Sequence, residues 1–263
     1  MDVRDILGDE NEKPLDRLVS DGGFVGIFRT ICCIGDSLSS GEFEIIDKSG
    51  AKRYLDFYDY SWGQYIGRMA GSKVYNFSRG GMTAREYCES FANANNFWSA
   101  DKAANAYIIA LGCNDILNRG EPIGEISDIK DDWRENAKTF IGYYAQIIMR
   151  YKEIQPEAKF FLVTFPSYPD ATDERKENIT RLQKAIYELA EHFSNCYVID
   201  LCKYSTPHDK LYHDNFQLLG HLNPMGYLLS AKIITSYIDY IIRHNMKDFK
   251  FVGLMGVEHT YAE

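Results

Sequence analysis

The sequence of 263 residues predicts one α/β domain built on a mainly parallel sheet of five strands. Short apolar runs alternate along the chain with longer segments in which apolar side chains recur every three or four residues. Strands that alternate with long helices are typical of a parallel sheet covered by helices on both faces. The sequence contains no internal repeat and no low-complexity tract that would indicate another architecture.

The apolar runs predict five strands, over residues 29–35, 73–77, 106–111, 159–164 and 197–201. The helical spacing predicts helices over 61–69, 84–93, 133–154, 173–193 and 224–244. Residues 41–60 have no clear period, and Lys48-Ser49-Gly50 within them indicates a turn. Since this stretch follows the first strand closely, we expect it to form one wall of a ligand pocket.

The two ends of the chain are predicted to belong to the single domain 1–263 as appendages. Residues 1–27 form a polar N-terminal extension that packs over the domain, and residues 245–263 form a C-terminal tail. Within the tail, the apolar piece 249–254 would serve as an edge strand or as a contact for a partner.

A formal net charge of -9 argues against a nucleic-acid-binding surface, because phosphate contacts need an excess of lysine and arginine. A neutral or cationic small molecule is easier to accommodate. The charged N-terminus, residues 1–16, has no long apolar run, so we expect neither a signal peptide nor a membrane anchor, and a cytoplasmic location. The sequence is compatible with a homo-oligomer.

The six cysteines show neither the spacing of a metal site nor the density of a disulfide framework. We interpret them as reduced and mostly structural, and the histidine and carboxylate spacing suits no metal template either. The sequence therefore predicts no metal and no cofactor.

A buried strand that ends in Gly35-Asp36-Ser37 presents the serine at the carboxyl edge of the sheet, where open α/β folds bind ligands. The glycine permits a tight turn into a helix whose first amides are unpaired. Ser37 could thus supply both an attacking hydroxyl and an amide for a developing oxyanion. Alternatively, Asp36 and Ser37 are the N-cap of an ordinary helix.

Two other predicted strands also end in polar turns, residues 78–83 and 112–115. Parallel strands place these turns side by side, so Ser37, Gly81 and Asn114 can meet at one site. Acyl transfer needs a hydroxyl, a base and an oxyanion hole, and these residues supply the first and the last. Of the six histidines, His221 is the candidate base, because its loop just before the last helix can return the ring to the sheet edge.

Four blocks in this order resemble the SGNH or GDSL hydrolases. They are Gly35-Asp36-Ser37-Leu38, a glycine within 76–83, Gly112-Cys113-Asn114-Asp115, and 221–227 (HLNPMGY). The blocks span residues 35 to 227, and three of them follow predicted strands. The resemblance implies a flavodoxin-like three-layer α/β/α fold and hydrolysis of an ester or thioester through an acyl-enzyme.

Carried over residue by residue, the resemblance makes Ser37 the nucleophile and an oxyanion amide, and His221 the general base. Gly81 supplies a second amide, with Gly80 as the alternative if this block is shifted by one, and Asn114 supplies a side-chain donor.

One position departs from the family pattern. The family usually has an aspartate three residues before the histidine, and this chain has Leu218, which cannot accept the imidazole N–H. Either a backbone carbonyl orients His221, or a carboxylate arrives from elsewhere, with Asp214 the nearest upstream and Asp200 an option at a strand end. We expect a working Ser-His dyad.

The predicted function is therefore that of a carboxylic ester hydrolase acting on a small acyl ester, such as an O-acetyl group on a sugar. The aromatic run 54–62 is compatible with sugar stacking as well as with simple packing. Two alternatives stay open: an O-acyltransferase using the same site, and a binding module that has lost catalysis. A flavin-binding protein is disfavoured because no phosphate-cradling loop is recognisable.

Overall fold

A computed structural model describes residues 2–9 and 11–258 of the chain. His259 and the end of the predicted tail lie outside the described residues. The central sheet has the order β4-β1-β5-β6-β7, and all four neighbouring pairs are parallel. Its strands are β1 (Thr30–Gly35), β4 (Lys73–Ser78), β5 (Ala106–Ala110), β6 (Lys159–Val163) and β7 (Cys196–Ile199). Counted along the sheet alone this is 2-1-3-4-5, the flavodoxin-like order, so the predicted fold class is confirmed.

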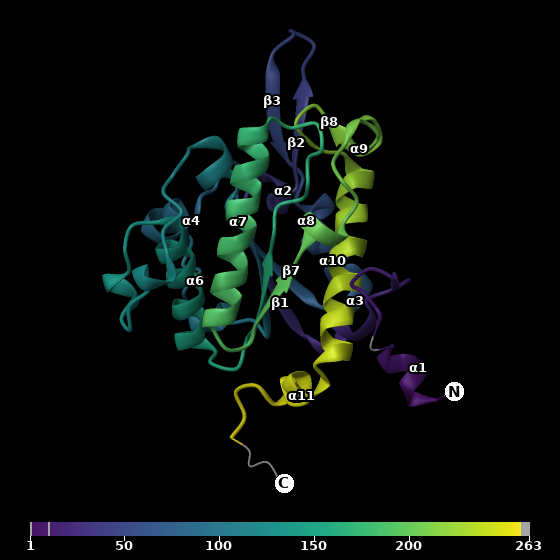
Figure 1. The fold of residues 1–263 in the computed structure, drawn as a ribbon, viewed down its shortest axis with the longest axis vertical. Helices are drawn as coiled ribbons and strands as arrows, with labels where there is room; N and C mark the ends of the chain where they lie inside the picture. Colours follow the sequence, from purple (N-terminus) through teal and green to yellow (C-terminus); the bar gives the residue numbers. More distant parts are fainter. Residues whose placement is uncertain (1, 10, 259–263) are drawn as a thin grey trace.

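Helices cover both faces of this sheet (Figure 1). One face packs against α6 (Phe140–Ile154), α7 (Asp173–His192) and the helical run α4, η3 and α5 (Ala84–Glu86, Tyr87–Phe91, Ala92–Ala94). The other face packs against α3 (Trp62–Ala70) and α10 (Pro224–His244). Short helices complete the fold: α1 (Val3–Leu7), α2 (Ser37–Ser40), α8 (Leu201–Tyr204), α9 (Lys210–Phe216) and α11 (Met246–Phe249).

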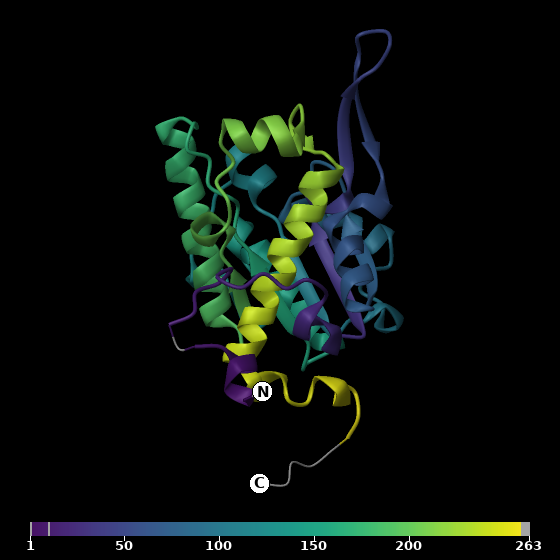
Figure 2. The same ribbon diagram turned by 90° about the vertical axis from the view of Figure 1, so that its right-hand side faces the viewer.

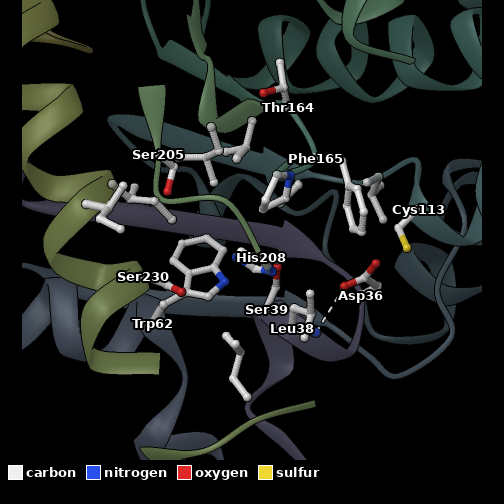
Figure 3. A pocket seen from close by; sticks show the side chains of 18 of the residues that line it. Asp36, Leu38, Ser39, Trp62, Cys113, Thr164, Phe165, Ser205, His208 and Ser230 are labelled. Carbon is white, nitrogen blue, oxygen red and sulfur yellow. Dashed lines mark hydrogen bonds between the residues drawn. The ribbon is translucent and has the colours of Figure 1, made fainter. Parts of the chain in front are cut away.

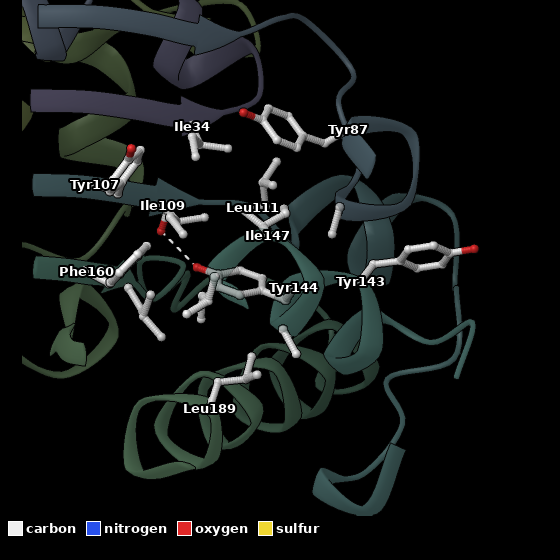
Figure 4. Close-up of a cluster of buried hydrophobic side chains, with 14 of the residues drawn as sticks. Ile34, Tyr87, Tyr107, Ile109, Leu111, Tyr143, Tyr144, Ile147, Phe160 and Leu189 are labelled. Carbon is white, nitrogen blue, oxygen red and sulfur yellow. Dashed lines mark hydrogen bonds between the residues drawn. The ribbon is translucent and has the colours of Figure 1, made fainter. Parts of the chain in front are cut away.

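Alternate residues of each central strand enter opposite cores. In β1, Cys32 and Ile34 join the core under α6 and α7, whereas Ile31 and Cys33 join the core under α10. Figure 4 shows the first of these cores, where the Tyr144 hydroxyl donates a hydrogen bond of 3.0 Å to the carbonyl of Ile109. Two buried faces explain why the strands are continuous apolar runs in the sequence.

Residues 42–56 form a β-hairpin that the sequence analysis did not predict. Strand β2 (Glu42–Ile46) pairs antiparallel with β3 (Lys52–Asp56), and the turn at Lys48-Ser49-Gly50 joins them. The hairpin projects beyond the carboxyl end of the central sheet (Figures 1 and 2). A second, minimal hairpin joins β8 (Gln217–Leu218) to β9 (His221–Leu222).

Two expected elements differ from the structure. The helix expected from residue 133 begins at Phe140, because the Thr139 hydroxyl caps it by accepting the amide of Gly142. The apolar piece 249–254 is not an edge strand. Phe249 instead packs edge-on against Phe28 and parallel to Phe161, and a 3₁₀ turn follows over Val252–Leu254.

The segment before β1 crosses over α10 (Figure 2). Arg243 of α10 is 4% exposed and binds Glu12 through two hydrogen bonds of 2.6 and 2.8 Å. Asp239 accepts a third bond from this guanidinium at 2.8 Å, and its other oxygen accepts the amide of Phe24. Buried charges therefore fix the extension to the last helix. Among the described residues, none of the helices has the length and apolar character needed to cross a bilayer.

We predict that Glu12→Gln lowers the free energy of unfolding by about 3 kcal/mol, because it leaves the buried Arg243 charge with one carboxylate instead of two. The hydrogen bond from Arg243 lowers the pKa of Glu12, so this contribution is present above the ordinary pKa of a glutamate and is lost as the pH falls through the lowered value. Thermal melts should show a deficit at about pH 6 that shrinks toward about pH 3. The exposed Glu135→Gln is the control; equal melting temperatures for both variants would contradict the role of the pair.

Candidate active site

The end of β1 sets the position of Ser37. The strand stops at Gly35, and α2 begins at Ser37 with Asp36 as its N-cap, whose carboxylate accepts the amide of Leu38 at 3.1 Å. Asp36 is 5% exposed, and burial raises its pKa to about 6. Ser37 itself is half-buried and lines an open cleft at this end of the sheet.

Gly81 and Asn114 reach the same cleft from the two strands that flank β1. Gly81 lies in the loop after β4 with φ of +71°, a conformation that favours glycine. Asn114 follows β5, and its Nδ2 donates to Asp36 at 3.3 Å and to the carbonyl of Met82 at 3.2 Å. Nδ2 of Asn118 donates to the side-chain oxygen Oδ1 of Asn114 at 2.9 Å. This bond fixes the side-chain amide of Asn114 with its N–H groups toward Asp36.

His221 enters the cleft from β9, and its Nδ1 lies 2.9 Å from a carboxylate oxygen of Glu44 on the hairpin. Glu44 is 3% exposed, and the same oxygen accepts the amide of Gly220 at 3.0 Å while Lys52 pairs with the other. Burial acts to raise the pKa of Glu44, but Lys52, His221 and the Gly220 amide lower it overall. A carboxylate can only accept, so Nδ1 carries the proton, and in the neutral ring Nε2 is the nitrogen whose lone pair can act as a base.

A second carboxylate faces the other ring nitrogen. Oε1 of Glu42 lies 3.2 Å from Nε2 of His221, because residues two apart on a strand share a face. Burial raises the pKa of Glu42, and the nearby carboxylates of Asp56 and Glu44 add to this while His221 opposes it. Within residues 2–9 and 11–258, no hydrogen bond joins the Ser37 hydroxyl to Nε2. Such bonds often form only when substrate is present.

The two aspartates suggested as orienting groups lie elsewhere. Asp214 is on the exposed face of α9 and pairs with Lys210 at 2.5 Å. Asp200 is fully buried, caps α8, and accepts hydrogen bonds from Thr164 and Tyr187 at 3.0 and 2.8 Å. The expectation for Asp214 is therefore corrected: the carboxylate beside the ring is that of Glu44, 177 residues away in the sequence.

Asp115 ties two of the site loops together. It is fully buried, and its Oδ1 accepts the amide of Ala84 at 2.8 Å, which joins the loop after β5 to the loop after β4. Burial raises its pKa to about 7. Burial also raises the pKa of the neighbouring Cys113 to about 12, which disfavours a thiolate nucleophile. In the described part of the chain, no three histidine, cysteine or acidic side chains are grouped as metal ligands would be.

Comparisons with known proteins identify a family and a fold. A sequence profile of the GDSL-like lipase/acylhydrolase family matches residues 33–229. A search of curated proteins finds no match.

Three solved structures share the fold. A family two carbohydrate esterase from Clostridium thermocellum, in complex with cellohexaose, is 14% identical with a TM-score of 0.56, covering 90% of this chain and 66% of that one. A carbohydrate esterase family 2 enzyme from Corynascus thermopiles (Myceliophthora fergusii) is 16% identical with a TM-score of 0.53, covering 81% and 66%. The psychrotrophic esterase EstA from Pseudoalteromonas sp., inhibited by monoethylphosphonate, is 16% identical with a TM-score of 0.52, covering 81% and 98%. This chain thus spans about two thirds of the two carbohydrate esterases.

We predict that Gly80→Ala moves the Glu42 carboxylate away from His221. A Cβ at position 80 would lie 2.2 Å from Oε2 of Glu42, and this flexible side chain gives way more easily than the backbone. A crystal structure of the variant should show the distance between Oε1 and Nε2 lengthened beyond 3.5 Å. Gly253→Ala is the control, since among the described residues other than its chain neighbours no atom lies within 4 Å of that Cβ. The packing argument is wrong if Glu42 keeps its contact in the variant at position 80.

Proposed function

The chain belongs to the GDSL-like lipase/acylhydrolase family, and we propose that it is a serine hydrolase that cleaves a short-chain acyl ester. The observation that carries this proposal is the hydrogen bond between Glu44 and Nδ1 of His221, in the cleft that Ser37 also lines. A buried carboxylate on the far nitrogen is what a histidine base needs, and it fills the role that Leu218 cannot perform.

The first half of the reaction forms an acyl-enzyme. The Ser37 hydroxyl attacks the ester carbonyl carbon while Nε2 of His221 takes its proton. The amides of Ser37 and Gly81 donate to the oxyanion of the tetrahedral intermediate, and Nδ2 of Asn114 joins them by exchanging one of its two present acceptors, Asp36 or the Met82 carbonyl. The bond from carbon to the leaving oxygen then breaks, and the imidazolium returns the proton to the departing alcohol. Glu44 stabilises the imidazolium while it exists.

The second half uses water in place of the alcohol. His221 removes a proton from the water while the water oxygen attacks the acyl carbon, and the tetrahedral intermediate uses the same donors. When it collapses, the bond from carbon to the Ser37 oxygen breaks, the imidazolium returns the proton to that oxygen, and the acid is released. An alcohol acceptor in place of water would make the same site an O-acyltransferase. Product analysis with added sugars or alcohols separates the two reactions.

We propose a carbohydrate as the alcohol of the ester, with O-acetyl sugars as the first substrates to try. Tyr54 lines the cleft, is 55% exposed, and contacts the His221 ring edge-on at 5.7 Å between centroids. An exposed aromatic face beside carboxylate acceptors such as Glu42 suits a sugar ring with free hydroxyls. The likeness to carbohydrate esterases supports the same choice.

Ser37→Ala should lower the turnover of p-nitrophenyl acetate by at least about 10³-fold, because the covalent route is lost while the oxyanion donors remain. In parallel, a fluorophosphonate probe should label the peptide that contains Ser37 in the native protein, and mass spectrometry locates the adduct. Equal turnover by native protein and variant would end the proposal. A native protein that neither turns over esters nor takes the label would be a binding module on this fold.

Glu44→Gln should lower kcat by roughly 10²- to 10⁴-fold with little change in KM, because glutamine keeps the shape but cannot hold the imidazolium as a carboxylate does. Asp214→Asn is the matched control and should retain native activity, since that side chain contacts Lys210 and not the ring. Glu44→Asp should recover part of the lost kcat, which a purely structural role would not require. The opposite pattern, with Asp214→Asn inactive and Glu44→Gln active, would refute the assignment.

A further inference from the structure

A second cavity lies directly behind the cleft, between the carboxyl ends of the sheet strands and α10 (Figure 3). We call it the chamber. Apolar and aromatic side chains form most of its lining, among them Leu38, Trp62, Val163, Phe165, Leu201, Tyr212, Leu222, Ile233 and Ile234. Polar groups are few, and the serines at its far side, Ser205 and Ser230, come from the segment after α8 and from α10.

Four residues line both the chamber and the cleft: Asp36, Leu38, Cys113 and Phe165. The first two of these flank Ser37 in the sequence. An acyl group bound to the Ser37 oxygen therefore lies next to the residues that separate the two cavities. The chamber is on one side of these residues and the open cleft is on the other.

The chemistry of the lining disfavours an anionic occupant. Burial lowers the pKa of His208 to about 4, and its Nδ1 is 2.9 Å from the Tyr168 hydroxyl, so the ring is neutral at pH 7. Cys113 and Tyr212 are neutral as well, because burial raises the pKa of both. Among the described residues that line the chamber, Asp36 is the one carboxyl and none carries a lysine or arginine cation that would offset it. An anion would not be stable there.

The lining favours hydrocarbon over water as the occupant of the chamber. Water there would find few polar partners, whereas an apolar ligand that displaces it removes nonpolar surface from water.

We propose that the chamber binds the aliphatic tail of the acyl group, so that the preferred ester carries a linear chain longer than acetyl. The volume of about 80 Å³ has room for roughly five to eight water-sized groups, which corresponds to an acyl chain of about four to eight carbons. This inference rests on the proposed function and refines it: the acyl tail enters the chamber, and the alcohol part stays in the cleft beside Tyr54 and Glu42.

The first test is the chain-length profile of the native protein with p-nitrophenyl esters of acetate, butyrate, hexanoate, octanoate and dodecanoate. Each buried methylene adds up to about fourfold in kcat/KM. We expect a rise of tenfold or more from acetate to hexanoate and a fall at dodecanoate, where the chain outgrows the chamber. A steady decline from acetate onward would overturn the chamber proposal and leave the proposed hydrolase function intact.

The second test fills the chamber from α10. Ser230→Leu should lower the ratio of kcat/KM for hexanoate to that for acetate by about tenfold, because the added side chain occupies the space of several methylenes. Ser90→Leu makes the same change on an exposed surface and should leave the ratio as it is. An unchanged ratio in a folded Ser230→Leu protein would refute the proposal.

A third measurement keeps the proposal testable if Ser230→Leu does not fold or if the native protein hydrolyses none of the esters. In the Ser37→Ala protein, 1-hexanol should bind and change the fluorescence of Trp62, which lines the chamber, whereas ethanol at the same concentration should not. Trp62→Phe identifies the signal among the three tryptophans. Saturable hexanol binding without ester turnover would separate a correct chamber from an incorrect function, and no binding would overturn the chamber.

Discussion

The contact between Glu44 and His221 is the interaction on which the candidate site depends, because Glu44 is the group that binds Nδ1 of the ring. The carboxylate comes from a hairpin outside the central sheet, and its direction is set by packing beneath that hairpin. Phe43, between the two glutamates, is buried against Phe57, Tyr60 and Tyr227 at centroid distances of 5.4, 5.7 and 5.6 Å. When alternate residues of β2 are fixed in this way, Glu42 and Glu44 must both face the histidine.

The remaining parts of the site follow from the parallel sheet. Strands β4, β1 and β5 are neighbours in the sheet, so the loops at their carboxyl ends lie side by side. Two buried side chains then fix these loops to neighbouring segments through hydrogen bonds. Asp115 accepts the amide of Ala84 from the adjacent loop, and the Tyr227 hydroxyl donates to the carbonyls of Ser37 and Glu42 at 3.3 and 2.6 Å. The nucleophile, the hairpin and the last helix are thus one hydrogen-bonded unit.

The sequence contains enough information for the sheet and for three of the loops, because a strand buried on both faces must be a continuous apolar run. It contains much less for the hairpin. Every residue of β3 is exposed, so Lys52–Asp56 shows no apolar alternation and its pairing with β2 leaves no strong pattern. The alternation Glu42-Phe43-Glu44 was the available signal, but two acids around one aromatic residue are equally typical of a solvated loop. Sequence spacing therefore does not predict Glu44 as the partner of His221. The nearest upstream aspartate, Asp214, is an ordinary surface residue.

Moving the orienting carboxylate from the histidine loop to a separate hairpin changes what the loop must do. Glu44 binds the Gly220 amide and the His221 ring through a single oxygen, so the backbone before the histidine and the ring itself become ordered by the same group. Leu218 is then free to remain 39% exposed, and the loop needs no acid of its own. The same hairpin carries Tyr54 and Glu42 to the rim of the cleft, whereas the chamber is built from the sheet, α10 and the segment before α9. Orientation of the base is thereby coupled to the wall that would contact the alcohol, whereas the proposed acyl side is built from other elements than the hairpin.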